Sequence, residues 1–226
     1  MPASRFDRTA DRYAEAARAR DWSDFLAWCE PAADDRVLDV AGGTGALAAA
    51  LAGRVADVTV VDASAAMLRH VEAPAHPVTA RAEALPFADG GFDLVTCVRA
   101  LHHLESPTRA LDEMVRVLAA DGRIVLEDFV ADADPQRARR WEEVEKLRDP
   151  GHGRLLAPGE ARSRLLAAGL AVDAEESWVE TRELDAWLAL AECEGDPAAR
   201  IRALVGGGEL QMQVGRARFR RPRPEG

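Results

Sequence analysis

An α/β fold with a doubly wound, mostly parallel sheet is predicted for this 226-residue chain by three features of its sequence. Short runs rich in β-branched residues alternate with helical patterns of about 10 residues, as in βαβ crossovers. A glycine-rich turn follows the first run, and an acidic residue ends the second. Both features are typical of the edge at which such sheets bind ligands.

Five runs are predicted to form the parallel strands. They span 36–41, 57–63, 76–80, 92–98 and 122–130, of which 76–80 has the weakest pattern. The helical patterns occupy 44–52, 64–71, 106–118, 134–147 and 160–168. Because the strand runs are short, β-branched and separated by helices, we expect both faces of the sheet to be covered.

The two ends of the chain are less regular. Apolar residues at helical spacing predict a helical segment within 4–30. After a Gly/Pro loop at 148–154, the predicted elements are a strand at 170–180, short helices at 183–193 and 197–205, and a small hairpin around Gly215.

Composition excludes several classes of protein. Asp and Glu (39) outnumber Lys and Arg (29), so the net charge is −10, and nucleic-acid binding is disfavoured because it needs a basic face. The cysteines are Cys29, Cys97 and Cys193, with no CxxC pair, which predicts reduced thiols and a cytoplasmic protein. The most apolar window, 38–53, is too short to span a bilayer, and the N-terminus has no apolar signal core.

The glycine-rich turn lies in "VLDVAGGTGALAAAL", at 37–51. Gly43 and Gly45 permit a tight turn and a close approach of a ligand to the backbone, and the helix that follows offers free N–H groups. Asp39 lies beside the turn, where a carboxylate suits a cationic ligand better than a pyrophosphate. A P-loop and a GxGxxG fingerprint are both absent. The remaining alternative is a strand-to-helix turn without a ligand.

Asp62 ends the second predicted strand, 17 residues after Gly45. In nucleotide-binding α/β folds an acidic residue about 20 residues beyond the glycine turn accepts hydrogen bonds from the ribose hydroxyls. Asp62 could instead cap the helix at 64–71, but Ser64 is also able to do so. We therefore predict that Asp62 binds a ribose.

The segment 36–130 resembles the class I S-adenosylmethionine-dependent methyltransferases, and within them the ubiquinone and menaquinone C-methyltransferase branch (methyltransferase type 11). Four stretches carry the resemblance in order: "VLDVAGGTG" (37–45), "VVDASAAML" (60–68), "AEALPFADGGFDLVTCVRALHHL" (82–104) and "RALDEMVRVLAADGRIVLEDF" (109–129). The resemblance implies a Rossmann-like fold, S-adenosylmethionine as cofactor and S-adenosylhomocysteine as its product.

The resemblance also implies which residues contact the cofactor. The methionyl contacts would be Asp39, Ala41 and Gly43, with Gly45 shaping the turn. The ribose and adenine contacts would be Asp62, Ala63, Met67, Ala82 and Glu83. Cys97 and Val98 would line the transfer site, and Tyr13 lies in a helix that often covers the cofactor in this family. Arg81 departs from the family, which often has an acceptor Asp there, because a guanidinium cannot accept a hydrogen bond.

Methyl transfer from a sulfonium needs a base only when the acceptor carries a proton. His102 and His103 follow the fourth predicted strand at its ligand-binding end, and we expect one of them to face the cleft. Their role is either that of a base or that of a structural part of the pocket. His152 lies in the loop 148–154, which is similar to a substrate-covering segment of the resembled family, and is a further candidate base. A solvent-exposed loop histidine is the alternative.

Three further residues are candidate substrate contacts. Arg99 could bind an anionic acceptor or form a surface ion pair, Trp141 could line an aromatic pocket, and Asp149 lies in the same loop as His152. The five histidines show no metal-ligand spacing, so no metal site is predicted. No Gly-x-Ser-x-Gly elbow is present, so hydrolase chemistry has no support.

Five arginines gather near the C-terminus: Arg216, Arg218, Arg220, Arg221 and Arg223. An anion or RNA contact is one interpretation, but we expect a solvated tail that balances an acidic chain. The resembled family often ends in an apolar strand that closes the sheet, and we expect this strand to be missing or unusual here. The presence of this strand decides how the sheet ends. It also bears on the number of subunits, for which a homodimer is one option.

We therefore predict one methyltransferase domain over 1–226. Its parts are an N-terminal helical lid (1–35), a cofactor-binding core (36–130), a lid or substrate segment (131–169), and the C-terminal sheet edge and tail (170–226). The expected activity is methylation of a small molecule, on carbon or oxygen, as part of small-molecule or secondary metabolism. The alternatives are cyclisation, decarboxylation or rearrangement with the same cofactor, and a cofactor-binding subunit without catalysis.

Overall fold

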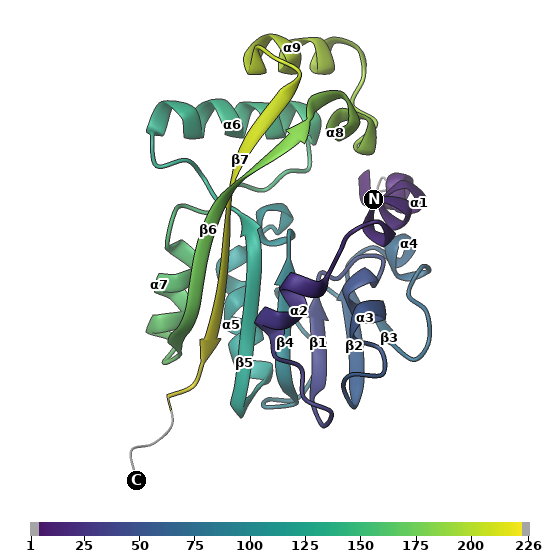
Figure 1. The fold of residues 1–226 in the computed structure, drawn as a ribbon, viewed down its shortest axis with the longest axis vertical. Coiled ribbons are helices and arrows are strands. Elements are labelled where there is room, and N and C mark those ends of the chain that lie inside the picture. Colours follow the sequence, from purple (N-terminus) through teal and green to yellow (C-terminus); the bar gives the residue numbers. More distant parts are fainter. Residues whose placement is uncertain (1–4, 223–226) are drawn as a thin grey trace.

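The computed structural model describes residues 5–222, which fold around a seven-stranded sheet (Figure 1). The strand order is β3-β2-β1-β4-β5-β7-β6. The first five strands are mutually parallel: β1 (Arg36–Val40), β2 (Asp57–Asp62), β3 (His76–Thr79), β4 (Phe92–Val98) and β5 (Leu118–Phe129). β7 (Glu209–Arg220) pairs antiparallel with both β5 and β6 (Ala171–Glu183). The predicted Rossmann-like fold class is confirmed.

Helices cover the sheet and its carboxyl edge. Those before β5 are α1 (Arg5–Arg18), α2 (Ser23–Cys29), α3 (Ala46–Leu51), α4 (Ala65–Leu68), the 3₁₀ helix η1 (Leu101–His103) and α5 (Pro107–Val117). Those after β5 are α6 (Pro135–Arg148), α7 (Glu160–Ala167), α8 (Leu184–Leu190) and α9 (Gly195–Val205). Figure 1 shows α6, α8 and α9 gathered beyond the carboxyl ends of the parallel strands, around the ends of β6 and β7.

Each face of the sheet carries its own apolar core. On one face Leu38 of β1 packs in a cluster with Met114 of α5. On the other face the neighbouring residue, Val37, packs in a cluster with Leu51 of α3. Successive residues of a strand point to opposite faces, so an apolar run such as β1 requires cover on both sides.

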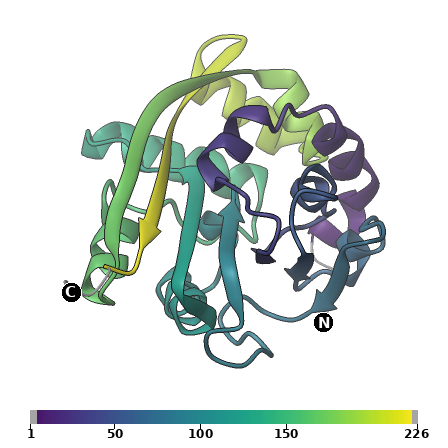
Figure 2. The ribbon, with the colours of Figure 1, turned by 60° about the horizontal axis from the view of Figure 1, so that its bottom comes forward.

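The helix α1 lies over the carboxyl edge of the sheet, beside α4, as the view in Figure 2 also shows. Several polar contacts tie α1 to its surroundings, among them the following three. Arg5 forms a buried ion pair with Asp149 after α6 (2.8 Å), and Arg12 donates to the carbonyl oxygen of Ala189 in α8 (3.0 Å). Ser64 donates its hydroxyl hydrogen to Asp7 (2.6 Å). The helix is therefore positioned to cover whatever occupies the sheet edge.

Most predicted elements occur within a few residues of their expected bounds. The helical segment expected within 4–30 is divided into α1 and α2 by residues 19–22. The strand expected at 122–130 begins at Leu118 in the structure. Within 5–222, no helix combines the length and the apolar character that are needed to cross a membrane.

The prediction for the C-terminus was wrong. No hairpin turns at Gly215: β7 runs unbroken from Glu209 to Arg220 and fills the position between β5 and β6. The closing strand, which was expected to be missing or unusual, is therefore present. Its sequence alternates apolar and polar residues, as a strand requires, and glycine interrupts that pattern without turning the chain.

The expectation of a solvated arginine tail was also wrong for the described part of it. Arg216 is only 5% exposed and forms ion pairs with three carboxylates, those of Glu127, Asp24 and Glu176. Arg218 is likewise largely buried and pairs with Asp173. These side chains satisfy acidic groups that come from distant parts of the sequence. Arg223 lies outside the described residues.

Candidate functional site

A cavity of about 870 Å³ opens at the carboxyl edge of the sheet. Its walls come from the turn after β1, the ends of β2, β4 and β5, the C-terminal half of β6, Arg216 of β7, and helix α1. Thirteen of the residues predicted from the sequence line it: Tyr13, Asp39, Ala41, Gly43, Asp62, Ala63, Met67, Ala82, Glu83, Val98, Arg99, His102 and His103. The cavity therefore brings together both the cofactor and the acceptor candidates.

Asp62 lies where a ribose could reach it. One of its carboxylate oxygens accepts from the Gly43 N–H (3.0 Å), and the other accepts from the Ser64 N–H (2.8 Å). Ser64 itself caps α4, because its hydroxyl accepts from the Met67 N–H (3.1 Å). Asp62 is thus not needed as a helix cap. Each carboxylate oxygen retains a lone pair for a hydroxyl donor in the cavity.

Asp39 is the buried carboxyl group of the turn. It is 2% exposed and accepts a hydrogen bond from the Thr96 hydroxyl (2.8 Å). Burial, opposed by this bond and reinforced by the charge of Asp62, raises its pKa to about 7. A cationic group in the cavity would favour the ionised form of Asp39.

Two positions of the turn have strict backbone requirements. A Cβ atom at Gly42 would overlap the Asp39 carboxyl group and would lie 2.9 Å from Val60 Cγ1, so only glycine fits there. Ala41 adopts a φ of +54°, a left-handed conformation that costs a residue with a Cβ about 1–2 kcal/mol. The turn of this chain therefore holds one strained residue beside the cavity.

The wall beyond Asp62 is built from Ala63, Met67, Ala82 and Glu83. Glu83 is buried, and its carboxylate accepts from the Ser106 N–H (3.1 Å). Arg81, which replaces the acceptor expected from the family, lies 3.4 Å from the Glu83 carboxylate and extends into solvent. An apolar wall with a fixed carboxylate suits a flat heteroaromatic ring.

His102 and Asp128 form a buried pair at the acceptor side of the cavity. His102 Nδ1 lies 2.5 Å from Asp128 Oδ1, and the His102 backbone N–H donates to Asp128 Oδ2 (3.1 Å). The Phe129 N–H also donates to Asp128 Oδ1 (2.7 Å). These bonds fix the carboxylate as an acceptor, so Nδ1 is assigned as a donor and Nε2 is left as the basic nitrogen.

His103 and His152 complete a cluster of three imidazoles. The His103 ring lies 3.9 Å from the His102 ring and 6.1 Å from the His152 ring, measured between centroids. Both His102 and His103 line the cavity, so the expectation that only one would face the cleft was wrong. Burial and the neighbouring His102 hold the pKa of His103 well below its ordinary value, which keeps this ring neutral.

Several predicted site residues lie behind the cavity wall. His152 is buried with its Nε2 3.5 Å from Glu142, and burial lowers its pKa. Asp149 accepts from Gly151 and pairs with Arg5. The other residues outside the lining are Gly45, Cys97 and Trp141. Cys97 is fully buried in the core, and Trp141 packs against Trp187 of α8. Their proposed roles at the site stay predictions.

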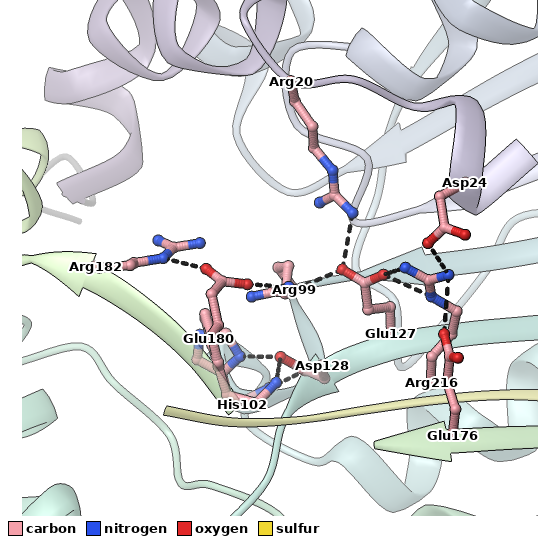
Figure 3. A network of polar contacts seen from close by, with 11 residues as sticks. Arg20, Asp24, Arg99, His102, Glu127, Asp128, Glu176, Glu180, Arg182 and Arg216 are labelled. Carbon is pink, nitrogen blue, oxygen red and sulfur yellow. Dashed lines mark hydrogen bonds and ion pairs between the residues drawn. The ribbon is translucent and has the colours of Figure 1, made fainter. Parts of the chain in front are cut away.

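A network of charges that the sequence analysis missed occupies the acceptor side (Figure 3). Glu127, at the end of β5, is fully buried and accepts from three arginines, Arg20, Arg99 and Arg216. Burial alone would raise the pKa of Glu127, but the three guanidinium groups together hold it below its ordinary value. One signal was available: "RIVLEDFV" places two acidic residues inside an otherwise apolar run, and buried carboxylates need partners.

The comparisons agree with this geometry. Residues 38–126 match the family model described as "Methyltransferase domain". The uncharacterized methyltransferase YcgJ of Bacillus subtilis is 30% identical over 211 residues, which cover 88% of this chain and 82% of YcgJ. The crystal structure of the YcgJ protein superposes with a TM-score of 0.84 and 25% identity, covering 94% of this chain and 100% of that one.

The chain belongs to the class I S-adenosylmethionine-dependent methyltransferases. It is an enzyme of this family, and S-adenosylmethionine is its cofactor. A demethylmenaquinone methyltransferase of Clavibacter sepedonicus is 32% identical over 167 residues, which cover 71% of this chain and 66% of that protein. This methyltransferase chain therefore spans slightly less than two thirds of that relative.

Proposed function

We propose that this methyltransferase acts on a small molecule that carries an ionisable hydroxyl group, with His102 as the base. The observation that supports the proposal is the 2.5 Å contact between His102 Nδ1 and Asp128 Oδ1 on the cavity wall. A base is required only if the acceptor must lose a proton. A buried histidine oriented by a carboxylate is arranged for that task.

The described residues also fit the cofactor. S-adenosylmethionine, when bound, supplies a methyl group that its sulfonium sulfur has already activated. Asp39 would face the cationic methionyl part, Asp62 would accept from the ribose hydroxyls, and Met67 and Ala82 would flank the adenine. These assignments rest on the fixed carboxylate of Asp62, on the position of Asp39 at the cavity wall, and on the apolar wall beyond Asp62.

His102 would take the hydroxyl proton at Nε2. Asp128 accepts the Nδ1 hydrogen, so it holds the ring in one tautomer and stabilises the positive charge that forms when Nε2 is protonated. The low dielectric of the site strengthens this pairing. His103, which stays neutral, adds no competing positive charge next to the imidazolium.

The same base serves methylation on oxygen or on carbon. Removing the proton from a phenolic hydroxyl activates the oxygen and also the ring carbon ortho to it. An ortho carbon that takes the methyl group then loses its own hydrogen as a proton, which restores the aromatic ring. Two further relatives are each named as a ubiquinone/menaquinone biosynthesis C-methyltransferase, which keeps the carbon outcome in the proposal. The two outcomes give products of equal mass that NMR distinguishes.

The test is to incubate the enzyme and S-adenosylmethionine with a panel of phenols and catechols. We expect S-adenosylhomocysteine to form together with a product heavier by one CH₂. His102→Asn should lower turnover by about 100-fold or more while cofactor affinity is kept. His76→Asn, a change at an exposed histidine on β3, is the matched control and should leave turnover unchanged.

Three outcomes would contradict the proposal. A converted acceptor without a mass gain would indicate rearrangement. Cofactor binding without turnover of any acceptor would indicate a binding subunit. Full activity of His102→Asn would show that the reaction does not use this base.

A further inference from the structure

We propose that the acceptor carries a carboxylate, which Arg99 and Arg182 bind above the ring of Phe129. This inference rests on the proposed function for the position of the base. Both arginines line the cavity on its acceptor side. Their guanidinium carbons lie over the Phe129 ring, 4.4 Å from its centroid for Arg99 and 5.2 Å for Arg182.

Arg99 is the better buried of the two. Its Nε donates to Glu127 (2.8 Å) and its Nη2 donates to Glu180 (2.6 Å). Its Nη1 is buried and has no hydrogen-bond partner among the described residues. A buried charged donor without a partner is costly, so a ligand that accepts from Nη1 would recover that free energy.

The backbone of Arg99 supports the same conclusion. The residue follows β4 with a φ of +55°, a left-handed conformation that is unfavourable for a long side chain. Its N–H donates to the Glu127 carbonyl oxygen (2.7 Å), which holds the chain in this conformation. Strained residues held in place by their surroundings are concentrated at functional sites. Arg99 lines the cavity in this conformation.

Arg182 supplies the second half of the anion site. Its Nε donates to Glu180, to the oxygen that Arg99 leaves free. Figure 3 shows the two terminal nitrogens of Arg182 without contacts to the residues drawn. Glu180 thus positions both arginines and uses one donor of each, which leaves further donors for a second carboxylate.

Phe129 connects the anion site to the base. Its ring packs edge-on against the His102 ring, with 5.5 Å between centroids. The two arginines contact the same ring. Trp178 and Trp187 also line the cavity. An acceptor that places a hydroxyl at His102 and a carboxylate at the arginines would therefore be an aromatic hydroxy acid.

The cofactor also carries a carboxylate, which the two arginines could bind in the same way. Variants of the arginines distinguish the two ligands, because they lose affinity for a different one in each case. If the arginines hold the cofactor, their replacement weakens binding of S-adenosylhomocysteine. If they hold the acceptor, the variants keep their affinity for S-adenosylhomocysteine and lose only their affinity for the acid.

The experiment measures binding to the enzyme saturated with S-adenosylhomocysteine, so it does not depend on methyl transfer. The probes are 4-hydroxybenzoate, 4-hydroxyphenylacetate and caffeate, each compared with its primary amide by NMR titration. We expect at least one acid to bind about tenfold more tightly than its amide, which corresponds to about 1.4 kcal/mol. Arg99→Met and Arg182→Met should remove this preference, and S-adenosylhomocysteine should bind both variants as it binds the wild type.

Arg162→Met, a change at an exposed arginine of α7, is the control and should keep the preference. Arg182→Met is the more informative variant, because Arg182 is partly exposed and its replacement leaves the buried ion pair of Arg99 and Glu127 intact. The inference is overturned if no acid binds more tightly than its amide or if both variants keep the preference. Loss of S-adenosylhomocysteine affinity would assign the arginines to the cofactor. An acid preference without methyl transfer would contradict only the proposed function.

Discussion

His102 and Asp128 belong to different parts of the sheet edge, yet their side chains meet at 2.5 Å. His102 lies in η1 after β4, and Asp128 lies near the end of β5. Because β4 and β5 are parallel neighbours, their carboxyl ends lie side by side and bring the two residues together. The fold itself therefore assembles the proposed base and the carboxylate that orients it.

The first prediction concerns this pair. Asp128→Asn should lower kcat by about 100- to 1000-fold, because an amide can donate to Nδ1 and so favour the wrong tautomer of His102. The KM for S-adenosylmethionine should stay unchanged, which separates a positioning role from general damage to the fold. Steady-state kinetics at saturating acceptor measure both constants. Equal losses in kcat and in cofactor affinity would point to a structural role instead.

The second prediction concerns the ribose contact. Asp62→Ala should weaken S-adenosylhomocysteine binding by about 1–3 kcal/mol, since it removes the acceptor for two hydroxyl donors. Calorimetry on the purified variant measures the loss. Asp57→Ala, at the other end of β2, is the matched control, because Asp57 pairs with His76 at the surface. Unchanged affinity in Asp62→Ala would remove this assignment.

The third prediction follows from the pKa of Asp39, which burial raises to about 7. A bound ammonium group favours the ionised carboxylate and lowers this pKa, so binding releases a proton below pH 7. The affinity for S-adenosylhomocysteine should therefore rise with pH and level off above about pH 7. Calorimetry in buffers of different ionisation enthalpy counts the released proton. Asp39→Asn should abolish the release, and a pH-independent affinity in the wild type would refute the argument.

The parts of the site that the sequence predicted share one property, which is that their signals are local. Asp39 and Gly43 are recognisable because a short strand and a turn follow each other directly, and Asp62 because it ends the next strand along the chain. The parallel sheet then fixes where those ends meet. His102 was found for the same reason, since it directly follows a strand.

The missed parts depend on contacts between distant residues. Glu127 and Arg216 are 89 residues apart and meet only because β7 inserts next to β5. The sequence around Gly215 was interpreted as the turn of a hairpin, because glycine often marks a turn, although the structure shows a single strand there. His152 was expected at the substrate, and the folding of its loop places it one layer behind His102.

The fourth prediction tests the strained turn. Ala41→Gly should raise the free energy of unfolding by up to about 1 kcal/mol, because relief of the left-handed φ outweighs the extra entropy of glycine in the unfolded chain. Urea unfolding followed by circular dichroism measures the change. Ala46→Gly, in the first turn of α3, is a control that should destabilise the protein. A loss of stability in both variants would show that the Ala41 conformation costs little.

The fifth prediction concerns Glu127, the shared partner of Arg20, Arg99 and Arg216. Glu127→Gln keeps the shape of the side chain and removes its charge. The buried Arg216 is then left with Asp24 and Glu176 as its only charged partners, and both of these side chains are exposed to solvent. Loss of one partner of a buried charge network costs about 3–5 kcal/mol, and we expect a decrease in unfolding free energy of that order at neutral pH.

The pH dependence of this loss provides its control. The arginines hold the pKa of Glu127 below its ordinary value of 4.5, so the stabilisation is present above that value and disappears as pH falls through the lower pKa of the folded state. The difference in unfolding free energy between the wild type and Glu127→Gln should therefore decrease as the pH falls. Glu175→Gln, at an exposed pair on β6, should change neither stability nor its pH dependence. A difference in unfolding free energy that stays constant down to acid denaturation would mean that the variant acts through packing and not through charge.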